Sequence, residues 1–174
     1  MLTNKANINL CTAVWLAADE YEFRPNWKQF SATGLLKSAK SIVLSYRYKE
    51  QTGAVVQDVT DLVPSRMGTA LHTSVEIAWE NERIRKQAMT RIGIPVQMQD
   101  QIALNPGYKG NPPLKKGQTP LYMEIRGQRK IDGYTISGKP DFVYDGQVQD
   151  LKSTKVFNWI HGGNDEKYMM QGSI

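Results

Sequence analysis

The sequence has little cysteine and little histidine. Its 174 residues include one cysteine, Cys11, and two histidines. A single thiol excludes an internal disulfide, an Fe-S cluster, and any zinc site that needs several thiolates from this chain. We expect Cys11 to be a small buried side chain.

Long hydrophobic runs are also absent. No segment approaches the run of about 18 apolar residues that a membrane helix needs. Residues 9–18 are apolar, but only Lys5 precedes them as a basic residue and Asp19 and Glu20 follow at once, so an amphipathic helix is expected rather than a signal peptide. We therefore expect no transmembrane segment, no membrane partner and a cytoplasmic location.

Acidic residues are fewer than basic ones. Seventeen Asp and Glu stand against 22 Lys and Arg, which gives a formal charge of +5 and favours polyanionic partners. An excess of this size also occurs in proteins that never bind nucleic acid. The length and the ordinary hydrophobic fraction of 40% predict one globular domain over residues 1–174.

Hydrophobic periodicity and turn residues predict a mixture of helices and strands. Helices are expected over 8–20, 31–48 (after a Ser31 cap), 65–87 and from 165 onward. Strands are expected over 122–130 and 133–136, a short strand or loop over 53–64, and a loop or flap over 95–120. Together with the hairpin described next, the strands are expected to form an antiparallel meander.

The strongest local signal is Asp145-Gly146 between two β-prone runs, which is typical of a two-residue hairpin turn. This turn predicts a register in which Asp141 faces Asp150. The period of two places Lys152 on the same side as Asp150. The other predicted pairs are Tyr144 with Gln147, Val143 with Val148, and Phe142 with Gln149.

Two carboxylates that face each other repel, so a cation is expected between them. Asp141, Asp150 and Lys152 would then form a cluster suited to Mg²⁺ or Mn²⁺. An ordinary exposed hairpin would show the same pattern. His72 and Glu76, four residues apart on one helix face, would support such a site, as would Glu124, although each also fits an ordinary surface or core position.

Five motifs occur in order along the chain: Ser31-Ala32-Thr33, Gly68-x-x-x-His72, Gly138-x-x-Asp141, Asp150-Leu151-Lys152, and Gln171. In this order they resemble the PD-(D/E)XK nuclease superfamily, in the branch of the RecB nuclease domain, lambda-type exonuclease and phage-encoded relatives. The resemblance extends from about Ser31 to Ile174. It implies an α/β (α+β) restriction-endonuclease-like core with a mixed, mainly antiparallel central sheet flanked by helices.

The resemblance also implies roles for individual residues. His72, Asp141, Asp150 and the backbone carbonyl of Leu151 would ligate the divalent ion, and Lys152 would position or activate the attacking water. Contacts with DNA are expected from Ser31, Thr33, Arg66, Lys155 and Gln171. Each of the basic residues among these is, taken singly, better explained as a solvated surface charge.

One departure from the family pattern concerns the Gln-x-x-x-Tyr motif. It would begin at Gln171, and the sequence ends at Ile174, before the tyrosine position. The resemblance therefore implies a nuclease domain that is truncated at its C-terminal end.

The expected function is that of a metal-dependent DNA nuclease, an exonuclease of DNA recombination, repair or phage DNA processing, in a bacterial or phage-infected cell. A homo-oligomer is left open: a toroidal trimer is known among lambda-type relatives, but no residue of this sequence argues for one. Two alternatives remain: a catalytically weak DNA-binding or regulatory relative, and a domain in which Asp141 and Asp150 bind an ion only for stability.

Overall fold

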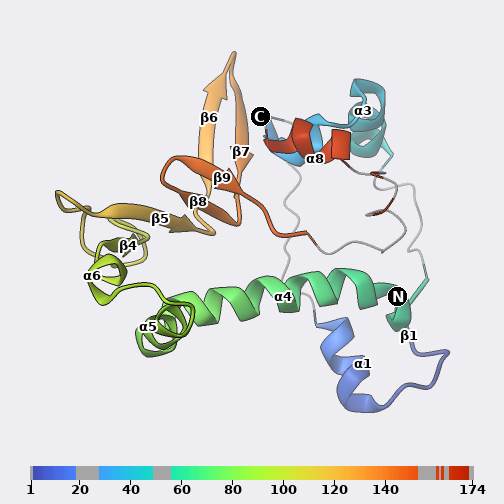
Figure 1. Ribbon diagram of the computed structural model, residues 1–174. Coiled ribbons are helices and arrows are strands. Elements are labelled where there is room, and N and C mark those ends of the chain that lie inside the picture. Colours follow the sequence, from blue (N-terminus) through green and yellow to red (C-terminus); the bar gives the residue numbers. More distant parts are fainter. Residues whose placement is uncertain are drawn as a thin grey trace. The chain divides into compact units, whose positions relative to one another are not determined.

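The computed structural model contains both helices and strands, with most of the strands in the C-terminal half of the chain (Figure 1). The structure describes residues 2–18, 28–48, 56–152, 160, 162 and 165–172. The helices are α1 (Leu10–Ala17), α2 (Ala32–Leu35), α3 (Ala39–Arg47), the 3₁₀ helix η1 (Val59–Leu62), α4 (Val63–Glu80), α5 (Glu82–Arg91), α6 (Val96–Gln99) and α8 (Asp165–Gly172). The strands are β1 (Leu2–Thr3), β2 (Gln29–Ser31), β3 (Gln57–Asp58), β4 (Ile102–Leu104), β5 (Thr119–Met123), β6 (Gly127–Ile131), β7 (Tyr134–Gly138), β8 (Phe142–Tyr144) and β9 (Gln147–Gln149). The predicted mixed α+β class is confirmed.

The chain divides into two compact units. The first unit comprises Met1–Ala70, Arg129–Ser137 and Asp165–Ile174. The second unit comprises Leu71–Gln128 and Gly138–Asn164.

In the first unit, α1 begins at an Asn9 cap and buries Leu16. Arg66 Nε donates a hydrogen bond of 2.9 Å to the Leu16 carbonyl, which lies in the last turn of α1. A cation suits this position because the last carbonyls of a helix are unsatisfied and carry partial negative charge. Cys11, expected to be buried, is exposed on α1. A single short helix has room to bury one stripe, and Leu16 occupies it.

Asp58 connects the N-terminal strand to η1. Its Oδ2 accepts hydrogen bonds from Lys5 N–H at 2.7 Å and from Thr3 Oγ1 at 3.0 Å. Its Oδ1 accepts from the N–H and the hydroxyl of Thr60, at 3.1 and 2.8 Å, and caps η1. These bonds, the Lys5 N–H first, favour the carboxylate and hold the pKa of Asp58 well below its ordinary value.

Asp58→Ala is expected to lower the Tm by about 2–4 °C, because it removes a cap and the link between β1 and η1. A depressed native pKa stabilises the fold above the ordinary carboxyl pKa, and this contribution is lost as the pH falls through the native value. The difference in Tm between wild type and variant should therefore be largest at pH 7 and become smaller in strong acid. Calorimetry at several pH values measures it, and an equal difference at every pH would contradict this account.

The single helix predicted over 31–48 is two helices. Ser31 caps α2, since its Oγ accepts the Gly34 N–H at 2.9 Å, as expected. Ser38 caps α3 in the same way, with Ser41 N–H at 3.2 Å. A serine that bonds to the backbone three residues ahead adopts extended φ and ψ, and so it interrupts a helical pattern that is otherwise continuous.

The strands do not form one meander as predicted. β2 pairs with β7 in parallel, in a three-stranded sheet of order β2-β7-β6. β8 and β9 belong to a different, four-stranded sheet of order β4-β5-β8-β9. The predicted strand over 122–130 divides into β5 and β6 because Glu124 has a φ of 54°, which a regular strand does not accommodate.

In the second unit, the helix predicted over 65–87 ends at Glu80, and Asn81 begins α5. Asn81 has extended φ and ψ and its Oδ1 accepts the Ile84 N–H at 3.1 Å. The new helix axis turns away from that of α4 at this residue (Figure 1). The predicted loop over 95–120 contains α6 and β4 as well as irregular backbone.

The predicted hairpin register is confirmed. Tyr144 pairs with Gln147, Val143 with Val148 and Phe142 with Gln149, all antiparallel. Asp145 and Gly146 have φ values of 47° and 76°, as a type I′ turn requires. β8 also pairs antiparallel with β5, whereas β4 and β5 are parallel, so this sheet is mixed and mainly antiparallel.

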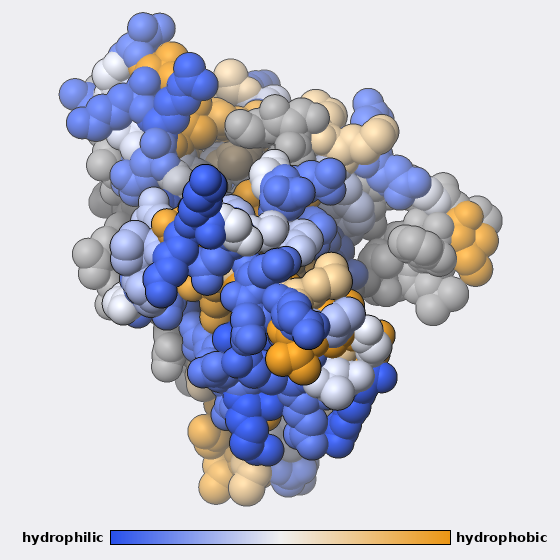
Figure 2. Space-filling model, turned by 60° about the vertical axis from the view of Figure 1, so that its left-hand side comes forward, coloured by the Kyte–Doolittle hydropathy of each residue, from blue (hydrophilic) through white to orange (hydrophobic). Residues whose placement is uncertain are grey.

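The core of the second unit includes Leu121 and Met123 of β5 and Met89 of α5. Buried Asn105 joins β4 to β5, since its N–H donates to the Leu121 carbonyl and its Oδ1 accepts the Met123 N–H, both at 2.7 Å. Figure 2 shows hydrophobic residues scattered among hydrophilic ones on one face of the molecule. Within the described ranges, no helix combines the length and hydrophobicity needed to cross a bilayer.

Candidate metal centre

Asp141 lies between two other carboxylates because of the register of β8. The β5–β8 pairing ends with Met123 opposite Phe142, and the Glu124 N–H donates to the Asp141 carbonyl at 3.2 Å. Asp141 directly precedes Phe142 and thus lies beside Glu124. On its other side, the β8–β9 ladder ends one pair before Asp150. Three carboxylates meet at this end of the sheet.

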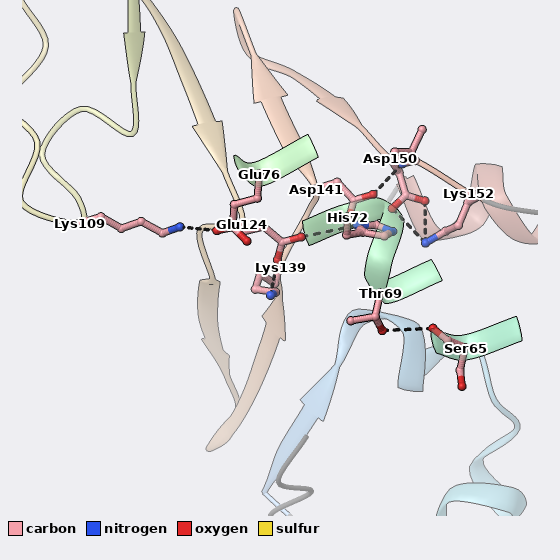
Figure 3. A network of polar contacts seen from close by, with 11 residues as sticks. Ser65, Thr69, His72, Glu76, Lys109, Glu124, Lys139, Asp141, Asp150 and Lys152 are labelled. Atoms are coloured by element: carbon pink, nitrogen blue, oxygen red, sulfur yellow. Dashed lines mark hydrogen bonds and ion pairs between the residues drawn. The ribbon is translucent and has the colours of Figure 1, made fainter. Parts of the chain in front are cut away.

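His72 on α4 completes the cluster. Its Nδ1 lies 3.2 Å from Asp141 Oδ1 and 3.7 Å from Glu124 Oε1 (Figure 3). The three groups offer ligand atoms that all lie within 4.8 Å of one another. Two ligands at right angles, each about 2.1 Å from an Mg²⁺ ion, are about 3.0 Å apart, so the 3.2 Å separation of His72 and Asp141 is close to that of adjacent ligands in an octahedral site. The donor set of two carboxylates and one imidazole suits Mg²⁺ and, better, Mn²⁺.

The cluster lines a small pocket whose lining also includes apolar residues. Val75, Met123, Phe142 and Leu151 line it together with the polar residues His72, Glu76, Glu124 and Asp141. Asp141 is only 8% exposed. Its Oδ2 accepts a short hydrogen bond of 2.6 Å from the Leu151 N–H, which fixes the direction in which Oδ1 points.

Burial raises the pKa of the Asp141 carboxyl above its ordinary value, and nearby Asp150 raises it further. The Leu151 N–H and His72 act in the opposite direction but do not cancel these effects. Ionisation of Asp141 therefore costs more here than in water, and a bound cation would offset that cost.

Asp141→Asn is expected to raise the Tm in EDTA at pH 7 by about 2–4 °C, because an uncharged amide removes the cost of a buried carboxylate. Because the native pKa of Asp141 is raised, its carboxyl group contributes most to stability below the ordinary carboxyl pKa. This contribution is lost as the pH rises through the native pKa. Wild type and variant should therefore have similar Tm values near pH 3 and diverge toward neutral pH. A variant that is less stable at every pH would contradict this interpretation.

The two remaining residues of the predicted hairpin cluster form an ion pair. Lys152 Nζ lies 3.0 Å from Asp150 Oδ1 and 2.9 Å from Asp150 Oδ2. The structure thus brings together Asp150 and Lys152, as the period of two predicts. Of the predicted ligands, His72 and Asp141 belong to the three-residue cluster, whereas the Asp150 carboxylate is directed at Lys152.

Two more lysines bind carboxylates in this region. Lys139 Nζ forms an ion pair with Glu124 Oε2 (Figure 3). Lys109 binds both Glu76, at 2.8 Å, and Glu80, at 3.1 Å. Glu76, considered as support for the site from the sequence, lines the pocket but has its carboxylate paired with Lys109.

Three of the residues predicted to bind DNA lie in a different unit from the cluster. Ser31, Thr33 and Arg66 lie in the first unit, where Ser31 caps α2 and Arg66 binds the end of α1. Lys155 lies outside the described residues. Gln171 lies in α8, and its side chain is outside what the structure describes.

Sequence reasoning gave too little weight to Glu124 and did not select Lys139. Glu124 could have been noticed as a carboxylate at the end of a strand. Its position beside Asp141, however, follows only from the pairing of β5 with β8. The signal for Lys139 is its spacing of two from Asp141, which favours the same side of an extended segment.

A larger pocket of about 360 Å³ also lies in the second unit. Its lining is mainly apolar and includes Trp79, Met89, Ile94, Met98, Ile102 and Tyr144. Arg85 and Tyr144 are its titratable lining residues, so it offers no cluster for acid–base or metal chemistry.

Comparison of the chain with family models finds no match, and comparisons with curated proteins and with solved structures find none either.

Proposed function

We propose that this chain is a divalent-metal-dependent deoxyribonuclease with a restriction-endonuclease-like core of the PD-(D/E)XK type. The observation that carries the proposal is the meeting of His72, Glu124 and Asp141 beside the Asp150–Lys152 pair. Four of these five residues stand in the motifs that resemble the superfamily. The residues named by the resemblance and the residues that cluster in space thus largely coincide.

His72, Glu124 and Asp141 would hold Mg²⁺ or Mn²⁺, with Asp150 and the Leu151 carbonyl as the further ligands that the resemblance implies. A bound divalent ion supplies a nucleophile from water and stabilises charge on the phosphorane-like transition state. Glu124 extends the ligand set that the sequence predicts, since its Oε1 faces the same imidazole nitrogen as Asp141.

Lys152 would act on the substrate side of the centre. Asp150 holds its ammonium by both carboxylate oxygens, so the charge is kept in one place. A positioned ammonium can orient the attacking water or stabilise negative charge that develops on the phosphate. Ser31, Thr33, Arg66, Lys155 and Gln171 would contact the DNA.

We further propose an exonucleolytic mode, within DNA recombination, repair or phage DNA processing in the cytoplasm of a bacterial or phage-infected cell. The test is incubation of end-labelled linear DNA and of covalently closed circular DNA with the chain in Mg²⁺, Mn²⁺ or EDTA. Degradation of the linear DNA alone, in either metal and not in EDTA, supports an exonuclease. Cleavage of both substrates would support an endonuclease, and absence of cleavage in every condition would contradict catalysis and favour a DNA-binding or structural role.

A further inference from the structure

Each carboxylate of the three-residue cluster directs one oxygen at His72 and gives the other to a donor of the protein. Asp141 Oδ1 lies 3.2 Å from His72 Nδ1, whereas Oδ2 accepts the Leu151 N–H at 2.6 Å. Glu124 Oε1 lies 3.7 Å from the same nitrogen, whereas Oε2 binds the Lys139 ammonium. Only Asp141 Oδ1 and Glu124 Oε1 are left to face a bound ion.

Asp150 differs from both, because Lys152 binds its two oxygens at about the same distance. The three carboxylates and two ammonium groups together carry a net charge of −1. One divalent ion would bring the site to +1, which attracts a phosphodiester. Two ions would bring it to +3, and like charges this close in a partly buried pocket are costly.

Two-metal sites hold ions about 3.5–4 Å apart, and a carboxylate between them binds one ion with each oxygen. Glu124 has this bridging arrangement, with His72 and Asp141 beside one oxygen and an ammonium on the other. The position that a second ion would occupy on Glu124 therefore holds the ammonium of Lys139.

The local sequence explains how Lys139 reaches this position. Pro140 disfavours the helical conformation for the residue before it, so Lys139 is restricted to extended φ and ψ. In an extended segment, residues two apart point to the same side, which directs Lys139 and Asp141 together.

We propose that Lys139 takes the place of a second divalent ion at Glu124, so that the centre binds one ion per chain. This inference rests on the proposed function, since it concerns the same centre. Lys139 acts through Glu124 and is a positioning residue, not a catalytic one.

The test is the number of Mn²⁺ ions bound per chain, measured by calorimetric titration and by the loss of the free Mn²⁺ signal in electron paramagnetic resonance. Wild type should bind one ion. Lys139→Met frees Glu124 Oε2 and removes a positive charge, so this variant should bind two. Lys139→Arg keeps the charge and should still bind one. Lys116→Met, a change of another exposed lysine on the loop after β4, is the matched control and should also bind one.

Two bound ions in wild type, or one in Lys139→Met, would overturn the inference. If Lys139→Met does not fold, as judged by circular dichroism, Lys139→Gln takes its place with the same expected count. Failure of the proposed function looks different. Wild type that binds two ions and cleaves DNA contradicts the inference alone, wild type that binds one ion without cleaving DNA contradicts the nuclease alone, and wild type that binds no Mn²⁺ contradicts both.

Discussion

Lys152→Met is expected to lower the rate of DNA cleavage by about 10²–10³-fold, the range found when one preorganised electrostatic group is removed from an active site. Methionine keeps the length and apolar stem of lysine but not its charge. Loss of the ammonium leaves the developing charge at the phosphate without this stabilisation. Single-turnover cleavage of end-labelled DNA in saturating Mn²⁺ measures the rate.

Mn²⁺ affinity should not fall in the same variant, because Lys152 binds Asp150 and not the oxygens that face His72. Lys115→Met, on the loop after β4, is the matched control and should cleave at the wild-type rate. An unchanged rate in Lys152→Met would exclude the proposed role of this residue. If the ion only stabilises the fold, cleavage will be absent from the wild type as well.

Glu124→Gln is expected to weaken Mn²⁺ binding by about 100-fold. The substitution keeps the shape of the side chain but removes the charge of a carboxylate whose Oε1 faces the cluster. Mutation of a residue that only supports a metal ligand already costs about 10–100-fold in metal affinity, so loss of a ligand charge should reach the upper end of this range. Calorimetric titration of wild type and variant measures the change.

Glu76→Gln provides the comparison, because Glu76 lines the same pocket but binds Lys109. Its Mn²⁺ affinity should change by less than about threefold. Equal losses in the two variants would mean that the ion responds to the general negative potential of the pocket and has no defined ligands.

The sequence predicts the hairpin at the centre of the site in detail. Asp145-Gly146 determines the turn, the turn determines the register, and the register places Asp141 and Asp150 at the same end of two neighbouring strands. These relations are local, since a two-residue turn leaves one way to pair the strands around it. The contact between Asp150 and Lys152 follows from the same period of two.

Contacts between distant segments are not predictable in this way. The pairing of β5 with β8 brings Glu124 to Asp141, and the position of α4 brings His72 to both. Neither is encoded in a local pattern, because each depends on which elements pack together. The motif order suggests His72 and Asp141 as partners through a resemblance. Glu124 belongs to none of the motifs, and Lys139 occupies an unspecified position of one.

Side chains that bond to the backbone explain the errors in helix length. Ser38 and Asn81 both lie inside apolar stripes that continue past them, and periodicity therefore predicts one helix where there are two. Each accepts a backbone N–H three residues ahead and starts a new helix. The residue types allow this but do not require it, since serine and asparagine also occur within helices.

The most direct test of the central claim is to compare Mn²⁺ binding with Mn²⁺ activation of DNA cleavage, in wild type and in Glu124→Gln. If the cluster of His72, Glu124 and Asp141 is the catalytic centre, the Mn²⁺ concentration for half-maximal cleavage should equal the measured Kd. Both values should rise together, by about 100-fold, in the variant. Cleavage that responds to Mn²⁺ equally in both proteins, or no cleavage when the ion is bound, would contradict the assignment of nuclease activity to this cluster.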